Sequence, residues 1–570
     1  MKIVQYILIA VFICTEVQNI SSQEFYLGAD LSYLNEMEDC GAIFYENSVA
    51  KDPYLIFDEH QATIVRYRLW HTPAWGNYSD YEDVKKAIER AKAVGLTVLL
   101  DFHNSDTWAD PGNQFRPVAW QGIDDLEILG DSLYNYTYQT LDRLHQENLL
   151  PEMVQIGNET NTNILRNVGD PGHPLDWDRN ITLFTRGIQA VQQINSDYGT
   201  DVKTMIHIAQ PENALWWFED ATANGFTSYD MIGISYYPGW SEMGIRETAE
   251  AIKILKETHN KEVIIVETGY PWTLEWDDNA GNILGADNLL PYYNNNPSTE
   301  THRDFLTELS WLVKDNGGSG VIYWEPAWVS TECGTQWAEQ GSHLENSTFF
   351  DFDWELHEGI EFMEYDYSVM PTALDSIPVT FKVDMTGVNT SEGVFVTGDF
   401  TGEAWQFMAM TNIGENIFEY NGKISGRSVG AYIFQNKGDW NTSSRENVPA
   451  ECALFWDTHR AFVVGDEATE FAFVWGSCTK IGELGVSEFD KPKIKLSPNP
   501  VQSKLNIQST FNIISIEVYD ISGIKVFEKT DIGKSTASIN LSSISDGMYL
   551  LTAITIDGQK IMEKIIKSAR

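Results

Sequence analysis

The chain has 570 residues, and its 83 acidic residues against 38 basic ones give a formal net charge of −45 at pH 7. At about 150 residues per domain this length predicts roughly three folded units, and the negative charge argues against nucleic acid as a partner. The 19 Trp, 25 Tyr and 27 Phe residues exclude a disordered acidic chain, which is poor in aromatic side chains.

Residues 1–22 have the pattern of a signal peptide. A lysine precedes the apolar run of MKIVQYILIAVFIC, which is too short and too near the N-terminus for an ordinary membrane span. Cleavage is expected near Ser21 or Ser22. Lipidation at Cys14 is the alternative, which the bulky neighbour Ile13 disfavours. Because no later stretch has 18 or more consecutive apolar residues, we expect no transmembrane segment in the mature chain.

Residues 23–375 alternate short apolar runs with amphipathic stretches. Eight runs are typical of strands: YLGADL, ATIVRYRLW, LTVLLDF, MVQIGNE, KTMIHI, MIGISYY, EVIIVET and GVIYWEP. Between them, stretches such as DYEDVKKAIERAKAVG have helical spacing of apolar residues and end at glycine, here Gly95. This pattern predicts an α/β fold, a parallel (β/α)8 TIM barrel with enlarged loops. A doubly wound sheet is the alternative, but no GxGxxG follows the first strand.

Two small all-β sandwich domains are predicted after the barrel. Near Asp375 the alternation gives way to short β-like runs such as VTFKVDM and GVFVTGDF, which predicts an accessory domain over residues 376–485. The last tryptophan is Trp475, and residues 490–570 carry 11 basic and 8 acidic residues, unlike the acidic chain before them. We therefore assign residues 486–570 to a separate C-terminal domain.

Cysteine content indicates an oxidising compartment. Without the signal peptide four cysteines remain, which allows three pairings, and they show no metal-ligand spacing. We favour a bond between Cys452 and Cys478, which are near in sequence, and a bond between Cys40 and Cys333, which would tie the two ends of the large domain. Four free buried thiols are the alternative.

Polar side chains gather at the C-terminal ends of the predicted barrel strands, where the active sites of such barrels form. Glu159 ends the fourth run and Glu267 ends the seventh, so both carboxyl groups can enter the same mouth. Retaining glycoside hydrolysis needs two carboxyl groups about 5 to 5.5 Å apart, one protonated and one ionised. We predict that burial keeps the proton on Glu159 and that Arg66 or Arg68 keeps Glu267 ionised. The alternative for each glutamate is a helix cap or a structural ion pair.

Tryptophans in the loops after these strands suit a sugar substrate, because the C–H face of a sugar ring stacks on an aromatic plane. They are Trp108, Trp120, Trp240, Trp272, Trp324 and Trp328. Loop packing is the alternative for any single one.

Residues 25–363 resemble glycoside hydrolase family 53, the endo-β-1,4-galactanases of type I arabinogalactan. The resemblance rests on GADLSYLNEMEDCGA, VRYRLW, VLLDFHNSDTWADPG, MVQIGNE, IGISYYPGW, VIIVETGYPWT and GVIYWEPAW. It implies a retaining enzyme that cuts internal bonds of pectic galactan, with Glu159 as acid/base and Glu267 as nucleophile. Together with the strand ends and the loops, it gives the expected substrate-binding residues Arg68, His103, Trp108, Asn158, His207, Tyr236, Trp272 and Trp324.

Other functions stay open beside this one. An endo-β-mannanase or endo-β-glucanase of the same clan would share both carboxylates, and a non-catalytic surface glycan-binding protein is a further alternative. Asn104 and Thr160 depart from the family pattern, which leaves the subsite preference open. No cofactor is required. Some relatives bind calcium in the loop after the seventh strand, and the oxygen-bearing candidates here are Asp277, Asp278, Asn279 and Asn282. A solvated acidic loop is the alternative that we favour, because the spacing matches the relatives poorly.

The two C-terminal regions carry resemblances of their own. Residues 378–480 resemble starch-binding-like β-sandwich modules, in which Trp405, Trp440 and Trp456 could form a sugar platform or fill the core. The tail from Lys495, with LSPNPVQSKLNI, IISIEVYDISGIKVFE and SDGMYLLTAITIDGQKIMEKIIK, resembles the C-terminal sorting domain of the type IX secretion system of Bacteroidetes. That implies export by the type IX machinery, followed by release or attachment at the cell surface. A plain accessory β-sandwich is the alternative for the tail. We expect a monomer.

Overall fold

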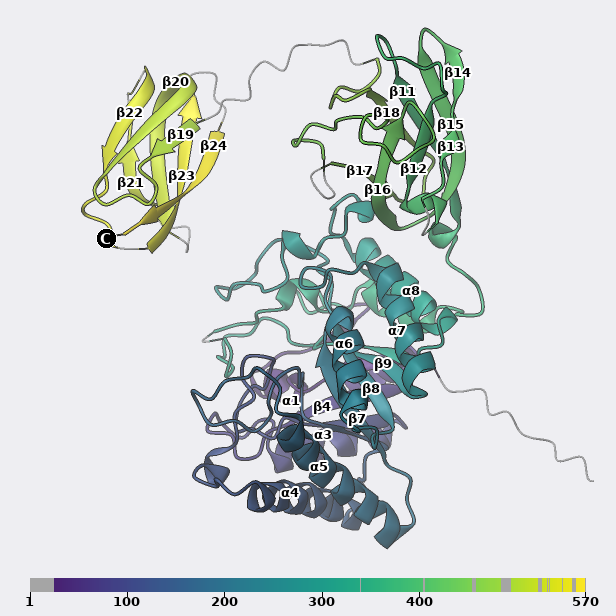
Figure 1. Cartoon of the computed structure of the whole chain (residues 1–570). Helices are drawn as coiled ribbons and strands as arrows, with labels where there is room; N and C mark the ends of the chain where they lie inside the picture. Colours follow the sequence, from purple (N-terminus) through teal and green to yellow (C-terminus); the bar gives the residue numbers. More distant parts are fainter. Residues whose placement is uncertain are drawn as a thin grey trace, which may run out of the picture. The chain divides into compact units, whose positions relative to one another are not determined.

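The computed structural model describes residues 25–338, 340–402, 405–453, 458–482, 494–520, 525–530, 532, 534–545, 547–555 and 560–568. The predicted signal peptide, Trp456 and the predicted boundary at 485–486 lie outside these residues. The chain divides into two compact units, Met1–Gly476 and Ser477–Arg570. The first contains a closed barrel and two four-stranded sheets, and the second contains a six-stranded sheet (Figure 1).

Eight parallel strands close the barrel, in the spatial order β1-β10-β9-β8-β7-β6-β5-β4. The strands are β1 (Tyr26–Asp30), β4 (Ile64–Leu69), β5 (Thr97–Phe102), β6 (Met153–Ile156), β7 (Lys203–Ala209), β8 (Met231–Tyr236), β9 (Glu262–Thr268) and β10 (Gly320–Tyr323). Each predicted run overlaps one of them, so the TIM-barrel prediction is confirmed. The barrel interior is filled by Ile64, Leu99, Met153, Met205, Met231, Ile264, Val266 and Ile322.

Helices cover the outside of the barrel and follow the strands in turn (Figure 1). They are α1 (Leu34–Asp39), α2 (Pro53–Glu59), α3 (Tyr81–Ala93), α4 (Leu126–Gln146), α5 (Trp177–Tyr198), α6 (Pro211–Ala223), α7 (Ile245–His259) and α8 (Thr299–Asp315). In α3, the side chain of Asp80 caps the N-terminus, and the apolar residues Val84, Ala87, Ile88 and Ala91 are buried as their spacing predicts.

A disulfide between Cys40 and Cys333 joins the loop after β1 to the long loop after β10, with 5.9 Å between the Cα atoms. This prediction is confirmed. Cys452 and Cys478 are also disulfide-bonded. The first bond ties together two loops at the C-terminal end of the barrel.

The middle region contains two four-stranded sheets around one apolar core. One sheet has the order β14 (Thr411–Gly414), β15 (Ile417–Ser425), β11 (Ser376–Asp384) and β18 (Thr469–Val474). The other has the order β13 (Met408–Ala409), β12 (Phe395–Gly398), β16 (Ser428–Gln435) and β17 (Arg460–Val464). Arg427, just before β16, forms a buried ion pair with Glu308 of α8 at 2.9 Å.

The second unit is also all-β. Its strands are β19 (Ile494–Ser497), β20 (Lys504–Asp520), β21 (Lys525–Lys529), β22 (Lys534–Asn540), β23 (Gly547–Thr555) and β24 (Lys560–Lys567). The long strand β20 pairs with β22 through its first half and with β23 through its second half. None of the helices described in either unit has the length and apolar character needed to cross a membrane.

His357 is a partly buried histidine that the fold holds neutral. Its Nε2–H donates to the carbonyl oxygen of Thr348 at 2.8 Å, and its Nδ1 accepts the N–H of Gly359 at 3.0 Å. Burial lowers the pKa of His357 to about 4, because the imidazolium form would lose its hydration. Protonation at Nδ1 would also place a second hydrogen against the Gly359 N–H.

We predict that His357 makes the protein less stable in acid. Between its ordinary pKa of 6.5 and its folded-state value of about 4, the unfolded chain binds the proton and the folded chain does not. The free energy of unfolding therefore falls with falling pH by about 1.4 kcal/mol per pH unit from this group. Urea unfolding of His357→Asn across this range should show a shallower fall, while the exposed His173→Asn should follow the parent protein. An unchanged slope in His357→Asn would contradict the assignment.

Candidate active site

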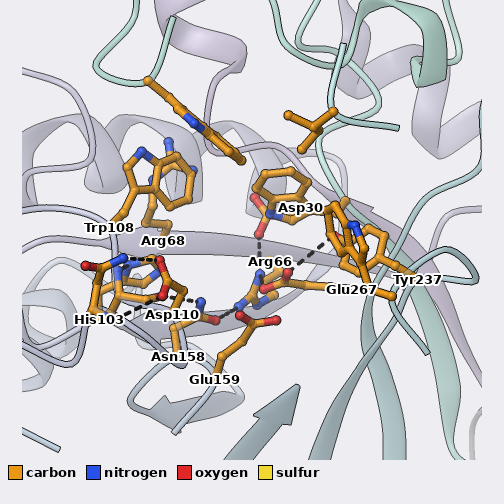
Figure 2. Close-up of a pocket in the computed structure, with 16 residues that line it drawn as sticks. Asp30, Arg66, Arg68, His103, Trp108, Asp110, Asn158, Glu159, Tyr237 and Glu267 are labelled. Carbon is orange, nitrogen blue, oxygen red and sulfur yellow. Dashed lines mark hydrogen bonds and ion pairs between the residues drawn. The ribbon is translucent and has the colours of Figure 1, made fainter. Parts of the chain in front are cut away.

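A pocket of about 350 Å³ opens at the C-terminal ends of the barrel strands (Figure 2). It is lined by Asp30, Arg66, Arg68, His103, Trp108, Ala109, Asp110, Asn113, Asn158, Glu159, Tyr237, Trp240, Glu267, Ile283, Trp324 and Trp337. The structure therefore brings together both predicted carboxylates and five of the eight expected substrate-binding residues. Figure 2 shows the carboxyl groups of Glu159 and Glu267 on either side of the Arg66 guanidinium.

Arg66 of β4 is the cation at the centre of the pocket floor. Its Nη1 lies 2.8 Å from Asp30 Oδ2 and 2.9 Å from Glu267 Oε1. Its Nη2 lies 2.7 Å from Asp101 Oδ2 and 2.7 Å from Asn158 Oδ1. Because the guanidinium is planar and presents five N–H donors in a rigid fork, it orients groups from several strands at once.

Glu267 of β9 is almost completely buried. Burial and the negative charge of Glu159 raise its pKa, and the Arg66 guanidinium opposes them. The hydroxyl of Tyr237 donates to Glu267 Oε2 at 3.3 Å. One oxygen of Glu267 therefore faces a cation and the other faces a hydroxyl donor.

A β-bulge directs Glu267 into the pocket. Ile264 and Val266 both belong to the barrel-interior cluster, so strict alternation would turn Glu267 outward. The pairing of β8 with β9 shifts by one residue after Ile234, and Glu267 then lies opposite Ser235. Bulges re-aim side chains in this way and are common next to active sites.

Glu159 follows β6 in an unusual backbone conformation. Its φ is +44°, in the left-handed region, and it follows Gly157 with φ +92°, where a Cβ would lie 2.6 Å from Thr160 Cγ2. Such conformations carry strain and are frequent at functional sites. The turn places Asn158 and Glu159 beside Arg66 (Figure 2).

The two glutamates differ in their electrostatic surroundings. Burial raises the pKa of Glu159, and the hydroxyl of Ser235, which donates to its Oε1 at 2.6 Å, opposes this rise. Among the described residues, Glu159 forms no ion pair, whereas Glu267 contacts Arg66 directly. Two neighbouring carboxyl groups, of which Glu267 is buried and Glu159 partly buried, resist double ionisation, so the pair holds one proton. The direct ion pair favours the proton on Glu159.

Aromatic side chains form the pocket wall. The Arg68 guanidinium carbon lies 4.3 Å from the ring centroid of Trp108. The Trp108 ring in turn lies 5.3 Å from Trp337 and 6.0 Å from Trp324, measured between centroids. Trp240 is 51% exposed and Trp337 is 40% exposed, so both offer open ring surface. Trp120, Trp272 and Trp328 do not line the pocket.

Three of the expected substrate-binding residues lie outside the pocket lining. Tyr236 faces away from it, and its hydroxyl donates to the carbonyl of Met243, because Ser235 and Tyr237 occupy the inward face of the alternating strand. The fully buried His207 contacts Ser235 Oγ at 2.8 Å. Trp272 packs against Phe352 and His357.

Sequence reasoning missed several lining residues. Asp30 ends the first strand, so the rule that selected the other strand ends could have found it. Tyr237 stands next to Tyr236 at the end of the sixth run, and the choice between the two required the register of β8. Asp110, Asn113 and Trp337 lie in long loops, where no strand-end signal marks them.

The acidic loop after β9 does not support calcium binding, the interpretation that the sequence pattern disfavoured. Asp278 Oδ1 accepts the N–H of Ala280, and its Oδ2 accepts from Ser330 Oγ and the N–H of Ser342, at 2.6 to 2.7 Å. The amide of Asn282 donates to Glu345. The oxygens of Asp278 thus already have protein donors. Within the described part of the chain, no group of three or more His, Cys, Asp or Glu residues is arranged to hold a metal ion.

Comparisons with known proteins cover the barrel and the tail. Residues 26–363 match the family model for glycosyl hydrolase family 53, and residues 495–568 match the secretion system C-terminal sorting domain. An arabinogalactan endo-beta-1,4-galactanase of Cellvibrio japonicus is 50% identical over 328 residues, which cover 57% of this chain and 86% of that protein. An endo-beta-1,4-galactanase of Bacillus subtilis is 32% identical over 353 residues, which cover 58% of this chain and 78% of that protein.

A solved structure agrees with these matches. The Ignisphaera aggregans GH53 catalytic domain has a TM-score of 0.53 and 28% identity, over 60% of this chain and 95% of that one. The match of the tail to the sorting domain indicates type IX secretion, so the chain is secreted or attached at the cell surface.

We predict that Arg66→Leu destabilises the protein severely. The variant leaves the buried carboxylates of Asp30, Asp101 and Glu267 without the cation with which all three form ion pairs. Breaking a buried ion pair from one side costs about 3 to 5 kcal/mol of unfolding free energy. Arg143→Leu is the matched control, because Arg143 and its partner Glu82 are both exposed. Exposed pairs contribute about 1 kcal/mol or less. Equal losses in urea unfolding of the two variants would contradict the role of Arg66.

Proposed function

This chain belongs to glycosyl hydrolase family 53, and we propose that it is a retaining endo-β-1,4-galactanase that hydrolyses internal bonds of type I arabinogalactan. The observation that carries the proposal is the pair Glu159 and Glu267 in one pocket, of which only Glu267 contacts Arg66. The 50% identity to a galactanase of Cellvibrio japonicus supports the choice of substrate.

The first chemical step forms a glycosyl–enzyme bond. A carboxylate oxygen of Glu267 attacks the anomeric carbon, and the bond from that carbon to the leaving oxygen breaks. Glu159 gives its proton to the leaving oxygen. Arg66 favours Glu267 as the nucleophile and Glu159 as the acid, because it stabilises the ionised form of Glu267.

The second step returns the enzyme to its starting state. Glu159, now ionised, takes a proton from water, and the water oxygen bonds to the anomeric carbon from the face that the leaving group vacated. The bond to Glu267 breaks, and its carboxylate is again held by Arg66. Two inversions give net retention of the anomeric configuration.

Neighbouring side chains are suited to hold the sugar. The Asn158 amide donates one hydrogen to the Ala109 carbonyl and its oxygen accepts from Arg66, so its second N–H can bind a sugar hydroxyl. Trp240, Trp324 and Trp337 offer ring planes to the polymer on either side of the cleaved bond. Tyr237 takes the place in the pocket that the sequence suggested for Tyr236.

We further propose the domain division 23–375 for catalysis, 376–485 for an accessory module and 486–570 for sorting, and a monomeric enzyme. The polymer is the partner of the barrel, and the type IX machinery is the partner of the tail. Digestion of galactan, mannan and cellulose in parallel separates the proposed enzyme from an endo-β-mannanase, an endo-β-glucanase and a binding protein without activity.

We predict that Glu159→Ala and Glu267→Ala each reduce kcat on linear galactan about a thousandfold while the fold is kept. The release of reducing ends measures the loss, and circular dichroism checks the fold. Azide separates the two roles on a galactobioside with a good leaving group. It should give an α-galactosyl azide with Glu267→Ala and a β-galactosyl azide with Glu159→Ala. The assignment fails if either variant keeps a tenth of the parent rate on galactan.

We also predict that Tyr237→Phe lowers kcat/KM about tenfold, because Glu267 loses a hydroxyl donor. Tyr236→Phe is the matched control one residue away. Its hydroxyl donates to the Met243 carbonyl outside the pocket, so we expect a stability loss of about 1 kcal/mol and unchanged kcat/KM. The reverse pattern in galactan hydrolysis would show that Tyr236 faces the substrate.

A further inference from the structure

A buried serine connects a buried histidine to Glu159. Ser235 of β8 and His207 of β7 are both completely buried and do not line the pocket. Ser235 Oγ lies 2.8 Å from His207 Nε2 and 2.6 Å from Glu159 Oε1. The three groups form a chain that runs from the barrel interior to the pocket.

The hydrogen bonds of His207 set the direction of this chain. Its Nδ1 lies 3.2 Å from the backbone nitrogen of Glu159 and 3.0 Å from Gln155 Nε2, both of which can only donate. Nδ1 is therefore an acceptor. Asn158 Oδ1 lies 2.9 Å from Nδ1, and this oxygen accepts a hydrogen bond from Arg66.

The proton of neutral His207 then belongs on Nε2. Burial lowers the pKa of His207 well below its ordinary value, so the ring is neutral and carries one proton. With Nδ1 accepting, Nε2–H donates to Ser235 Oγ. The serine hydroxyl has its own hydrogen free for the other neighbour within reach, Glu159 Oε1.

We propose that Ser235, oriented by His207, is a positioning residue that occupies Oε1 of Glu159 and so assigns the transferable proton to Oε2. This inference rests on the proposed acid/base role of Glu159. The serine donates to Oε1 both before and after proton transfer. It therefore stabilises the carboxylate that remains once the leaving oxygen has taken the proton.

The other groups that face Glu159 do not replace this donor. Arg66 is the nearby cation, but its hydrogen bonds and ion pairs go to Asp30, Asp101, Asn158, Gln155 and Glu267. The neighbouring charges of Asp101 and Asp110 raise the pKa of Glu159. The charge of Glu159 in turn raises the pKa of Glu267. Tyr237 donates to Glu267. Without Ser235, burial and like charge would act on Glu159 with only Arg66 opposing them.

The test is the pH profile of Ser235→Ala on linear galactan. The basic limb of kcat/KM reports the loss of the Glu159 proton in the free enzyme. In Ser235→Ala we expect this limb to move up by about 1 pH unit, because the carboxylate loses its donor. We also expect kcat/KM on the plateau to fall about tenfold. An aryl galactobioside whose leaving group needs no proton should show a much smaller fall in kcat/KM.

Two control variants separate positioning from packing. Ser235→Thr keeps the hydroxyl and should restore the basic limb. Ser310→Ala truncates a completely buried serine on α8 that does not line the pocket, and should leave the profile unchanged. If Ser235→Thr does not fold, the difference between the infrared titrations of Ser235→Ala and of the double variant Ser235→Ala/Glu159→Gln gives the pKa of Glu159 directly.

The outcomes distinguish this inference from the proposed function. Glu159→Gln is measured alongside. If it retains turnover on galactan, the acid/base role itself is wrong. If it is inactive while the basic limb of Ser235→Ala does not move, the proposed function stands and the positioning role is overturned. A shifted limb that Ser235→Thr restores supports the proposal.

Discussion

The buried guanidinium of Arg66 is the contact on which the pocket depends. Its partners come from β1, β5, β9 and the segment after β6, so one planar cation connects four parts of the barrel end. A buried ion pair adds little net stability, since desolvation offsets the attraction. Its effect is geometric: the planar guanidinium fixes three carboxylates and one amide in a single arrangement around it.

Two chemically identical side chains thereby acquire different roles. Glu267 is aimed by a bulge at a cation and a phenol, and Glu159 is held by a left-handed turn against a serine hydroxyl. Glu267 is buried and Glu159 is partly buried, and both lie among negative charges, so the pair holds one proton. The direct ion pair of Glu267 with Arg66 favours the proton on Glu159.

The wall of the pocket depends on loops that are fixed by contacts away from Glu159 and Glu267. The bond between Cys40 and Cys333 fastens the loop that continues to Trp337, and Arg68 packs on Trp108 while pairing with Glu325. These contacts present aromatic planes beside the carboxyl pair without adding charge to it. Aromatic planes beside a charged floor suit a polymer of uncharged sugars.

Apolar periodicity was sufficient to predict the eight strands and the helix α3, because the spacing of apolar residues within a short segment determines which face of that segment is buried. The strand-end rule likewise predicted Glu159 and Glu267 from sequence alone. The tertiary structure alone decided that Tyr237 rather than Tyr236 enters the pocket and that the bulge turns Glu267 inward. It also decided that Ser330 and Ser342 donate hydrogen bonds to the carboxylate of Asp278. Strand register and loop closure depend on partners far away in the sequence, and a one-residue shift reverses the face that a side chain takes.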